Sequence, residues 1–270
     1  ICSMMATAWD EQGSGMRNWT KAELRMNDNQ KKTYDLVVSL GGNCSAAHNL
    51  RFRGLRPVSL PFDWCYLVDA QPIRFWIDEV ARGFPNLLKK EHLREILPGD
   101  KEFAPAHSDV KQYVDTGSGY RFVNHFHRTI DEPGEYDTVF EMIHKRANRL
   151  VSAFERGGSF LLVLATPVDV PIELLKRLVE TCSERFGNSH FDLRYCHFEQ
   201  GHDTEQNLGG GIIVQNVGRR MNDYDFLKTN WEWHFLDNIA VRTKRTHHRK
   251  ISFRIWPRVD CVISLLKKGN

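Results

Sequence analysis

The chain has 270 residues, 41% of them apolar and 11% aromatic, which is enough to build a large domain with a hydrophobic core. This composition excludes a disordered chain and a short scaffold held together by disulfides. The 37 basic and 34 acidic residues give a formal charge of +3, so the overall balance does not indicate a nucleic-acid partner.

The longest apolar run covers residues 160–165, far below the roughly 20 residues that cross a membrane. No basic segment precedes a hydrophobic stretch at the beginning of the sequence, so no signal peptide is predicted. We therefore expect a soluble, cytoplasmic protein. Its six cysteines form no C-x-x-C pair, which favours free thiols over a zinc knuckle or a disulfide framework.

Three regions differ in composition. Residues 1–33 are polar, show no sustained hydrophobic period and are predicted to form a poorly ordered lead-in. Residues 34–240 are predicted to form one α/β domain. Residues 241–270 contain nine Lys or Arg against one acidic residue, with apolar residues interleaved, which predicts a basic amphipathic appendage able to contact an anionic surface.

The first half of the predicted domain opens with a strand and a helix. Residues 36–40 form an apolar run closed by Gly41 and Gly42, which predicts a buried strand that ends in a tight turn. A helix is predicted to begin near Ser45 and to end at Gly54. Further along we predict a helix at residues 73–80, an irregular stretch at 87–118 and an alternating strand at 120–127.

The second half alternates strands with helices. From Tyr136 until Gly157 apolar residues recur every three and four positions, which predicts a long amphipathic helix. Strands are predicted at residues 160–165, 191–198 and 212–217, and a helix at 172–186. The glycines at 209–211 precede a strand, so they are interpreted as a flexible hinge and not as a phosphate loop. This alternation predicts a single three-layer α/β domain with a central, largely parallel sheet; the alternative is an α+β papain-like fold.

Cys44 is the candidate nucleophile. It follows the first predicted strand and stands where a helix begins, and the carboxyl end of a strand is where reactive groups collect in open α/β sheets. A helix amino terminus favours the thiolate, which is the attacking form of cysteine. Gly42 would let a substrate approach the backbone, and Asn43 could donate a hydrogen bond to an oxyanion beside the Cys44 N–H. The structural alternative is a small buried thiol that closes a turn.

A catalytic thiol needs a base, and His125 and His127 are the candidates. Residues two apart on a strand project to the same side, so either imidazole could take the proton while the other lines the site. The same His-x-His spacing also occurs in metal sites, and with Asp63 or a third histidine it could hold zinc or iron. Because no third ligand stands at a diagnostic spacing, no metal or other cofactor is predicted.

Two segments resemble a known family. The run from Ser39 to Cys44 has the form S-L-G-x-x-C, and residues 61–64 have the form P-F-D-W. Together they resemble the opening motif of an uncharacterised bacterial family of papain-like cysteine peptidases. The resemblance covers roughly residues 35–165 and implies a Cys–His hydrolase in which Cys44 is the nucleophile and His125 is the base.

The same resemblance draws attention to further residues. A carboxylate usually orients the base, and Asp63 is the first candidate and Asp169 the second. Asp63 has an equally plausible structural interpretation, as a turn residue that caps backbone N–H groups. Ser59 and Trp64, from the same block of sequence, are the candidates for contact with substrate, although packing is the more ordinary role for Trp64.

Taken together, these features predict a cysteine-dependent hydrolase or acyl transferase. Its substrate would be a peptide, an acyl compound or a glycan-linked molecule. Two alternatives stay open: a binding module without catalysis, in which the segment before Cys44 is only a turn, and a metal-dependent hydrolase built on His125 and His127.

Overall fold

A computed structural model describes most of the predicted domain. The described residues are 7–9, 16–18, 31–42, 44–104, 109–199, 204–218 and 231–242. Asn43 and residues 243–270 lie outside them, as does most of the predicted lead-in, so the three predicted regions keep their boundaries as predictions. No helix among the described residues is both long enough and apolar enough to cross a membrane.

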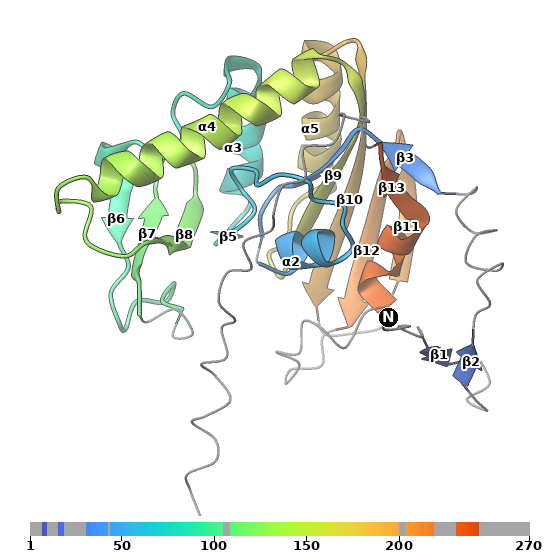
Figure 1. Cartoon of the computed structure of the whole chain (residues 1–270), viewed down its shortest axis with the longest axis horizontal. Helices are drawn as coiled ribbons and strands as arrows, with labels where there is room; N and C mark the ends of the chain where they lie inside the picture. Colours follow the sequence, from blue (N-terminus) through green and yellow to red (C-terminus); the bar gives the residue numbers. More distant parts are fainter. Residues whose placement is uncertain are drawn as a thin grey trace, which may run out of the picture.

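A five-stranded sheet forms the centre of the fold, in the order β11-β12-β10-β9-β4 (Figure 1). Its parallel strands are β4 (Leu36–Ser39), β9 (Gly158–Thr166), β10 (Ser189–Glu199) and β12 (Ile212–Gly218). The edge strand β11 (Thr204–Gly209) pairs antiparallel with β12. Because parallel strands need crossover helices, both sheet faces are covered, and the two neighbouring strands β4 and β9 are largely apolar runs. The predicted α/β class with a largely parallel central sheet is confirmed.

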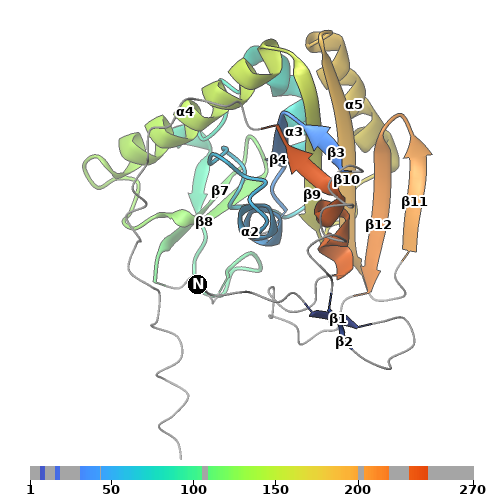
Figure 2. The same ribbon diagram turned by 45° about the vertical axis from the view of Figure 1, so that its right-hand side comes forward.

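Helices cover the two faces of this sheet (Figure 2). One face carries α5 (Ile172–Arg185), with α3 (Gln71–Glu79) and α4 (Glu135–Glu155) beside it, and the other carries α2 (Cys44–Phe52) and the 3₁₀-helix η4 (Trp231–Asn238). Successive residues of β9 point to opposite faces of the sheet and so contribute to two hydrophobic cores. Leu162 and Leu164 pack in the core under α5, whereas Leu161 and Val163 pack in the core under α2 and η4. The three-layer arrangement follows from this alternation.

A second, antiparallel sheet lies beside the first and under the amino-terminal half of α4 (Figure 1). Its order is β5 (Cys65–Leu67), β8 (Tyr120–Phe126), β7 (Lys111–Asp115) and β6 (Leu93–Glu95). Short 3₁₀-helices, η1 (Val80–Arg82) and η2 (Lys90–His92), lead into it. The prediction that residues 87–118 are irregular is therefore wrong for β6 and β7. Their charged residues interrupt the alternation of apolar and polar side chains that marks a strand in the sequence.

Short strand pairs complete the fold. β1 (Thr7–Trp9) and β2 (Met16–Asn18) form an antiparallel pair, and β3 (Lys32–Tyr34) pairs in parallel with β13 (Ile239–Val241). The glycines at 209–211 all have positive φ and form the turn between β11 and β12, so the predicted flexible hinge is a hairpin turn.

Candidate functional site

A tight glycine turn places Cys44 at the carboxyl end of the central sheet. Gly41 and Gly42 have φ values of 87° and 108°, which residues with side chains rarely adopt. A Cβ added to Gly42 would lie 2.1 Å from the carbonyl oxygen of Ala165 in β9. The space expected to admit a substrate at Gly42 is therefore taken by the neighbouring strand. The Gly42 N–H donates to the Cys65 carbonyl at 3.1 Å, so it is not available to a substrate oxygen.

Tyr66 is a polar partner of the candidate nucleophile. Cys44 is the first residue of α2 and is half-buried, and the Tyr66 hydroxyl donates to its Sγ at 3.5 Å. Burial, followed by the charge of Cys44, raises the pKa of Tyr66 well above its ordinary value, so the hydroxyl keeps its proton near neutral pH. The Arg121 guanidinium lies 5.5 Å from the centre of the Tyr66 ring, across the β5–β8 pair. The thiol thus faces a fixed hydrogen-bond donor.

One helical turn further along α2, His48 contacts Trp64. The two ring centres are 4.8 Å apart in an edge-on arrangement, and the Arg56 guanidinium lies 5.3 Å from the Trp64 ring. The sequence predicted Trp64 as a residue that contacts substrate, whereas His48 was not predicted as a site residue. The C-x-x-x-H spacing of Cys44 and His48 on a predicted helix was the available signal.

Asp63 lies in a buried ion pair. Its Oδ2 accepts hydrogen bonds from Arg56 Nε at 2.6 Å and from the Leu60 N–H at 2.8 Å, and both charged side chains are at least 94% buried. Burial raises the pKa of Asp63, and Arg56 opposes this shift. Among the described residues no histidine hydrogen-bonds to Asp63. Its contacts match the capping interpretation, and its role as an orienting carboxylate stays a prediction.

His125 and His127 differ in burial, and only His125 lies within β8. His125 is 8% exposed, whereas His127 is exposed and follows Phe126, the last residue of β8. The pairing of β8 with β7 shifts register between Lys111 and Tyr113, which breaks the alternation. Strand alternation therefore does not relate the two imidazoles, and their place on one side stays a prediction.

The His125 ring lies inside the protein. It packs edge-on against Phe122 at 5.2 Å between ring centres, and its buried Nδ1 has no hydrogen-bond partner among the described residues. Burial, followed by the charge of Arg146, lowers the pKa of His125 to about 3. Within the described part of the chain neither His125 nor His127 hydrogen-bonds to Cys44. Both therefore stay predictions as the catalytic base.

The buried neutral His125 leads to a pH prediction. An unfolded chain binds a proton at this residue near pH 6.5, whereas the folded protein does so only near pH 3, so acid favours unfolding between these values. At pH 5 the cost is about 2 kcal/mol relative to pH 8. Urea unfolding at both pH values should show that His125→Gln loses less stability than wild type on acidification. An unchanged pH dependence in the variant would contradict this.

The remaining predicted residues lie apart from one another. The Ser59 hydroxyl accepts from Arg56 at 2.8 Å, and its carbonyl accepts from Arg149 at 3.0 Å. Asp169 is exposed beyond the end of β9. In the described ranges no group of three or more His, Cys, Asp or Glu residues is arranged to hold a metal ion. The alternative of a metal-dependent hydrolase therefore gains no support from these residues.

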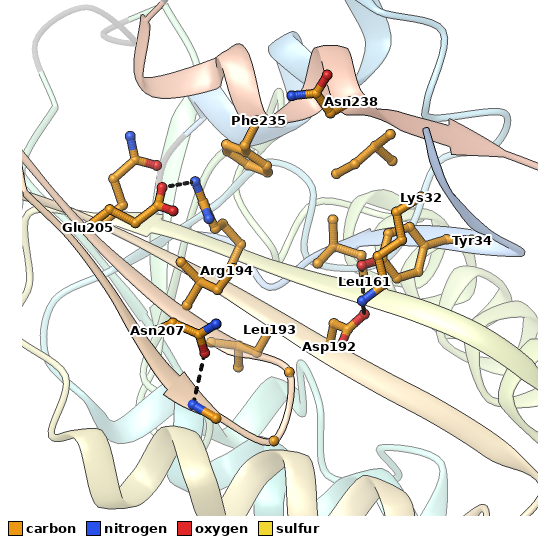
Figure 3. A pocket seen from close by; sticks show the side chains of 16 residues that line it. Lys32, Tyr34, Leu161, Asp192, Leu193, Arg194, Glu205, Asn207, Phe235 and Asn238 are labelled. Atoms are coloured by element: carbon orange, nitrogen blue, oxygen red, sulfur yellow. Dashed lines mark hydrogen bonds and ion pairs between the residues drawn. The ribbon is translucent and has the colours of Figure 1, made fainter. Parts of the chain in front are cut away.

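A separate cavity of about 660 Å³ lies on the central sheet, which sequence analysis did not predict (Figure 3). Two ion pairs line it: Arg194 with Glu205 at 2.5 Å and Lys32 with Asp192 at 2.7 Å. The Arg194 guanidinium also lies 4.4 Å from the centre of the Phe235 ring. Since Asp192 lies near the beginning of β10, whereas the thiol follows the end of β4, the cavity is not part of the thiol site.

Fold and site together define the class: an α/β protein with a free thiol where its first central strand passes into a helix. Residues 35–150 match the family model described as "Putative papain-like cysteine peptidase (DUF1796)". This match runs from β4 into α4 and confirms the resemblance seen in the S-L-G-x-x-C and P-F-D-W segments. No curated protein and no solved structure matches the chain.

Proposed function

We propose that the protein is a cysteine-dependent hydrolase or acyl transferase with Cys44 as its nucleophile. The observation that carries this proposal is the half-buried Cys44 thiol, the first residue of α2, with the Tyr66 hydroxyl 3.5 Å from its sulfur. A helix amino terminus stabilises developing negative charge, and a fixed hydroxyl donor adds to that effect. The family match supports the same chemistry.

In this proposal the Cys44 thiolate attacks a carbonyl carbon of the substrate. The electron pair of the C=O bond moves to oxygen, and the Tyr66 hydroxyl and the first N–H groups of α2 stabilise the oxyanion. Collapse of this intermediate expels the leaving group and leaves an acyl group on sulfur. Water then releases the acid in a hydrolase, and another nucleophile accepts the acyl group in a transferase.

The substrate proposal keeps the classes that the sequence predicts: a peptide, an acyl compound or a glycan-linked molecule. Asn43 is proposed as a second oxyanion donor, since it directly precedes Cys44 in the chain. Trp64 is proposed to contact substrate, because its ring lies one helical turn along α2 from the thiol, against His48.

The test uses p-nitrophenyl acetate as a probe, with nitrophenol release and protein mass followed together. Wild type should release nitrophenol and carry one acetyl group on Cys44, whereas Cys44→Ala should lose at least a hundredfold in rate and carry none. Cys65→Ser is the matched control, because the thiol of Cys65 is buried in the core and donates to the Pro61 carbonyl, a hydrogen bond that a serine hydroxyl can also make. Retention of the wild-type rate in Cys44→Ala would contradict the proposal.

A further inference from the structure

Cys44 and His48 lie on the same face of α2. Residues four apart on a helix are neighbours, with Cβ atoms about 5–6 Å apart. Both contact one short segment of the chain, Cys44 through Tyr66 and His48 through Trp64. Trp64 directly precedes β5 and Tyr66 is the second residue of β5, so the two contacts come from positions two apart in the chain.

Trp64 holds the imidazole at this position. Its ring contacts His48 at 4.8 Å and the Arg56 guanidinium at 5.3 Å, and Arg56 itself forms an ion pair with the buried Asp63 carboxylate. His48 is otherwise exposed, so its ring can reach solvent and substrate. His125, by contrast, is buried.

We propose that His48 is the imidazole that takes the proton from Cys44, a role that the sequence assigned to His125. This inference rests on the proposed function, because it names the base of the same thiol site. The imidazole accepts the proton of Sγ–H as the sulfur electron pair attacks the carbonyl carbon. It then returns this proton to the leaving group when the C–X bond breaks, so the ring is unchanged after each acyl transfer.

The surroundings of His48 suit a base. Partial burial, followed by the charges of Arg51 and Arg56, lowers the pKa of His48, so the ring is neutral near neutral pH and can accept a proton. From β5 the Tyr66 hydroxyl contacts the thiol, and the Arg121 guanidinium lies against the Tyr66 ring.

The experiment measures alkylation of Cys44 by iodoacetamide between pH 5 and pH 9, with the labelled peptide quantified by mass spectrometry. His48→Gln should label Cys44 at pH 7 at least tenfold more slowly than wild type, and the rate should keep rising to pH 9. His190→Gln is the matched control, because this exposed histidine is the second residue of β10 and pairs with Asp192, at the other end of the central sheet from the thiol. It should label at the wild-type rate.

Wild-type labelling of His48→Gln over the whole pH range would overturn the proposal, as would slower labelling in His125→Gln alone. Thermal unfolding of each variant verifies the fold, and exposed His48 tolerates a glutamine without a cavity. The two proposals fail separately. Loss of hydrolysis in Cys44→Ala with unchanged labelling of His48→Gln contradicts the base alone, whereas full hydrolysis by Cys44→Ala contradicts the function.

Discussion

Replacement of Gly42 by alanine is expected to destabilise the protein by about 3–5 kcal/mol, or to prevent folding. Gly42 has φ of 108°, and an added Cβ would lie 2.1 Å from the Ala165 carbonyl oxygen, closer than any real contact. The clash is with backbone of the central strand β9, which cannot move without breaking its pairing with β4 and β10. Urea unfolding followed by far-UV circular dichroism measures this loss.

Gly54→Ala is the matched control. Gly54 also has a positive φ, 70°, but nothing lies within 4 Å of an added Cβ, so only backbone strain of about 1 kcal/mol is expected. Equal losses in both variants would show that strain, and not the approach of β9, accounts for glycine at position 42. The comparison also tests whether the turn before Cys44 is set by packing between strands.

Replacement of Asp63 by alanine should cost about 3–5 kcal/mol, because it leaves the Arg56 guanidinium charged and unpaired in the interior. The Arg56 side chain is only 6% exposed, and the Leu60 N–H loses its acceptor at the same time. Chemical unfolding measures the loss, and the double variant Asp63→Leu with Arg56→Met should recover part of it, because no charge is then left unpaired.

Asp237→Ala is the matched control for Asp63. Asp237 also pairs with an arginine, Arg53, but its side chain is 53% exposed, so its loss should cost below about 1 kcal/mol. If Asp63→Ala is as stable as Asp237→Ala and yet inactive, Asp63 acts in catalysis and not in the ion pair. If it is destabilised as expected, the structural interpretation of the P-F-D-W block is supported.

The elements that sequence analysis predicted are those whose burial shows in the pattern of apolar residues. β9 is buried from Phe160 to Thr166, and α4 and α5 bury one face every three to four residues. β7 was not predicted because it contains a charged residue, Asp115, that is fully buried. The Asp115 carboxylate is stabilised there by hydrogen bonds from the Leu88 N–H and from Ser118. No periodicity reveals a carboxylate that is buried because distant backbone groups satisfy it.

For the candidate site, too, sequence analysis predicted the features that are set locally and missed those that depend on how strands pair. Cys44 lies at the strand-to-helix junction as expected, because glycines and a following apolar face mark that junction locally. The placement of His125 depends on a register shift between β7 and β8, which is a property of two strands together. His48 was within reach of sequence analysis, since its spacing from Cys44 follows from the helix alone.

The pairing of β3 with β13 has a consequence for the order of folding. β3 pairs with β13, which lies more than 200 residues later in the sequence. The adjacent ion pair joins Asp35 and Arg242, which are 207 positions apart. Contacts so remote in the chain are slow to form. During synthesis β3 and β13 can pair only after residue 241 has left the ribosome. The residues that pair β9 with β10 are synthesised about forty residues earlier in the chain. Nascent chains should therefore protect the central sheet from protease before they protect Tyr34.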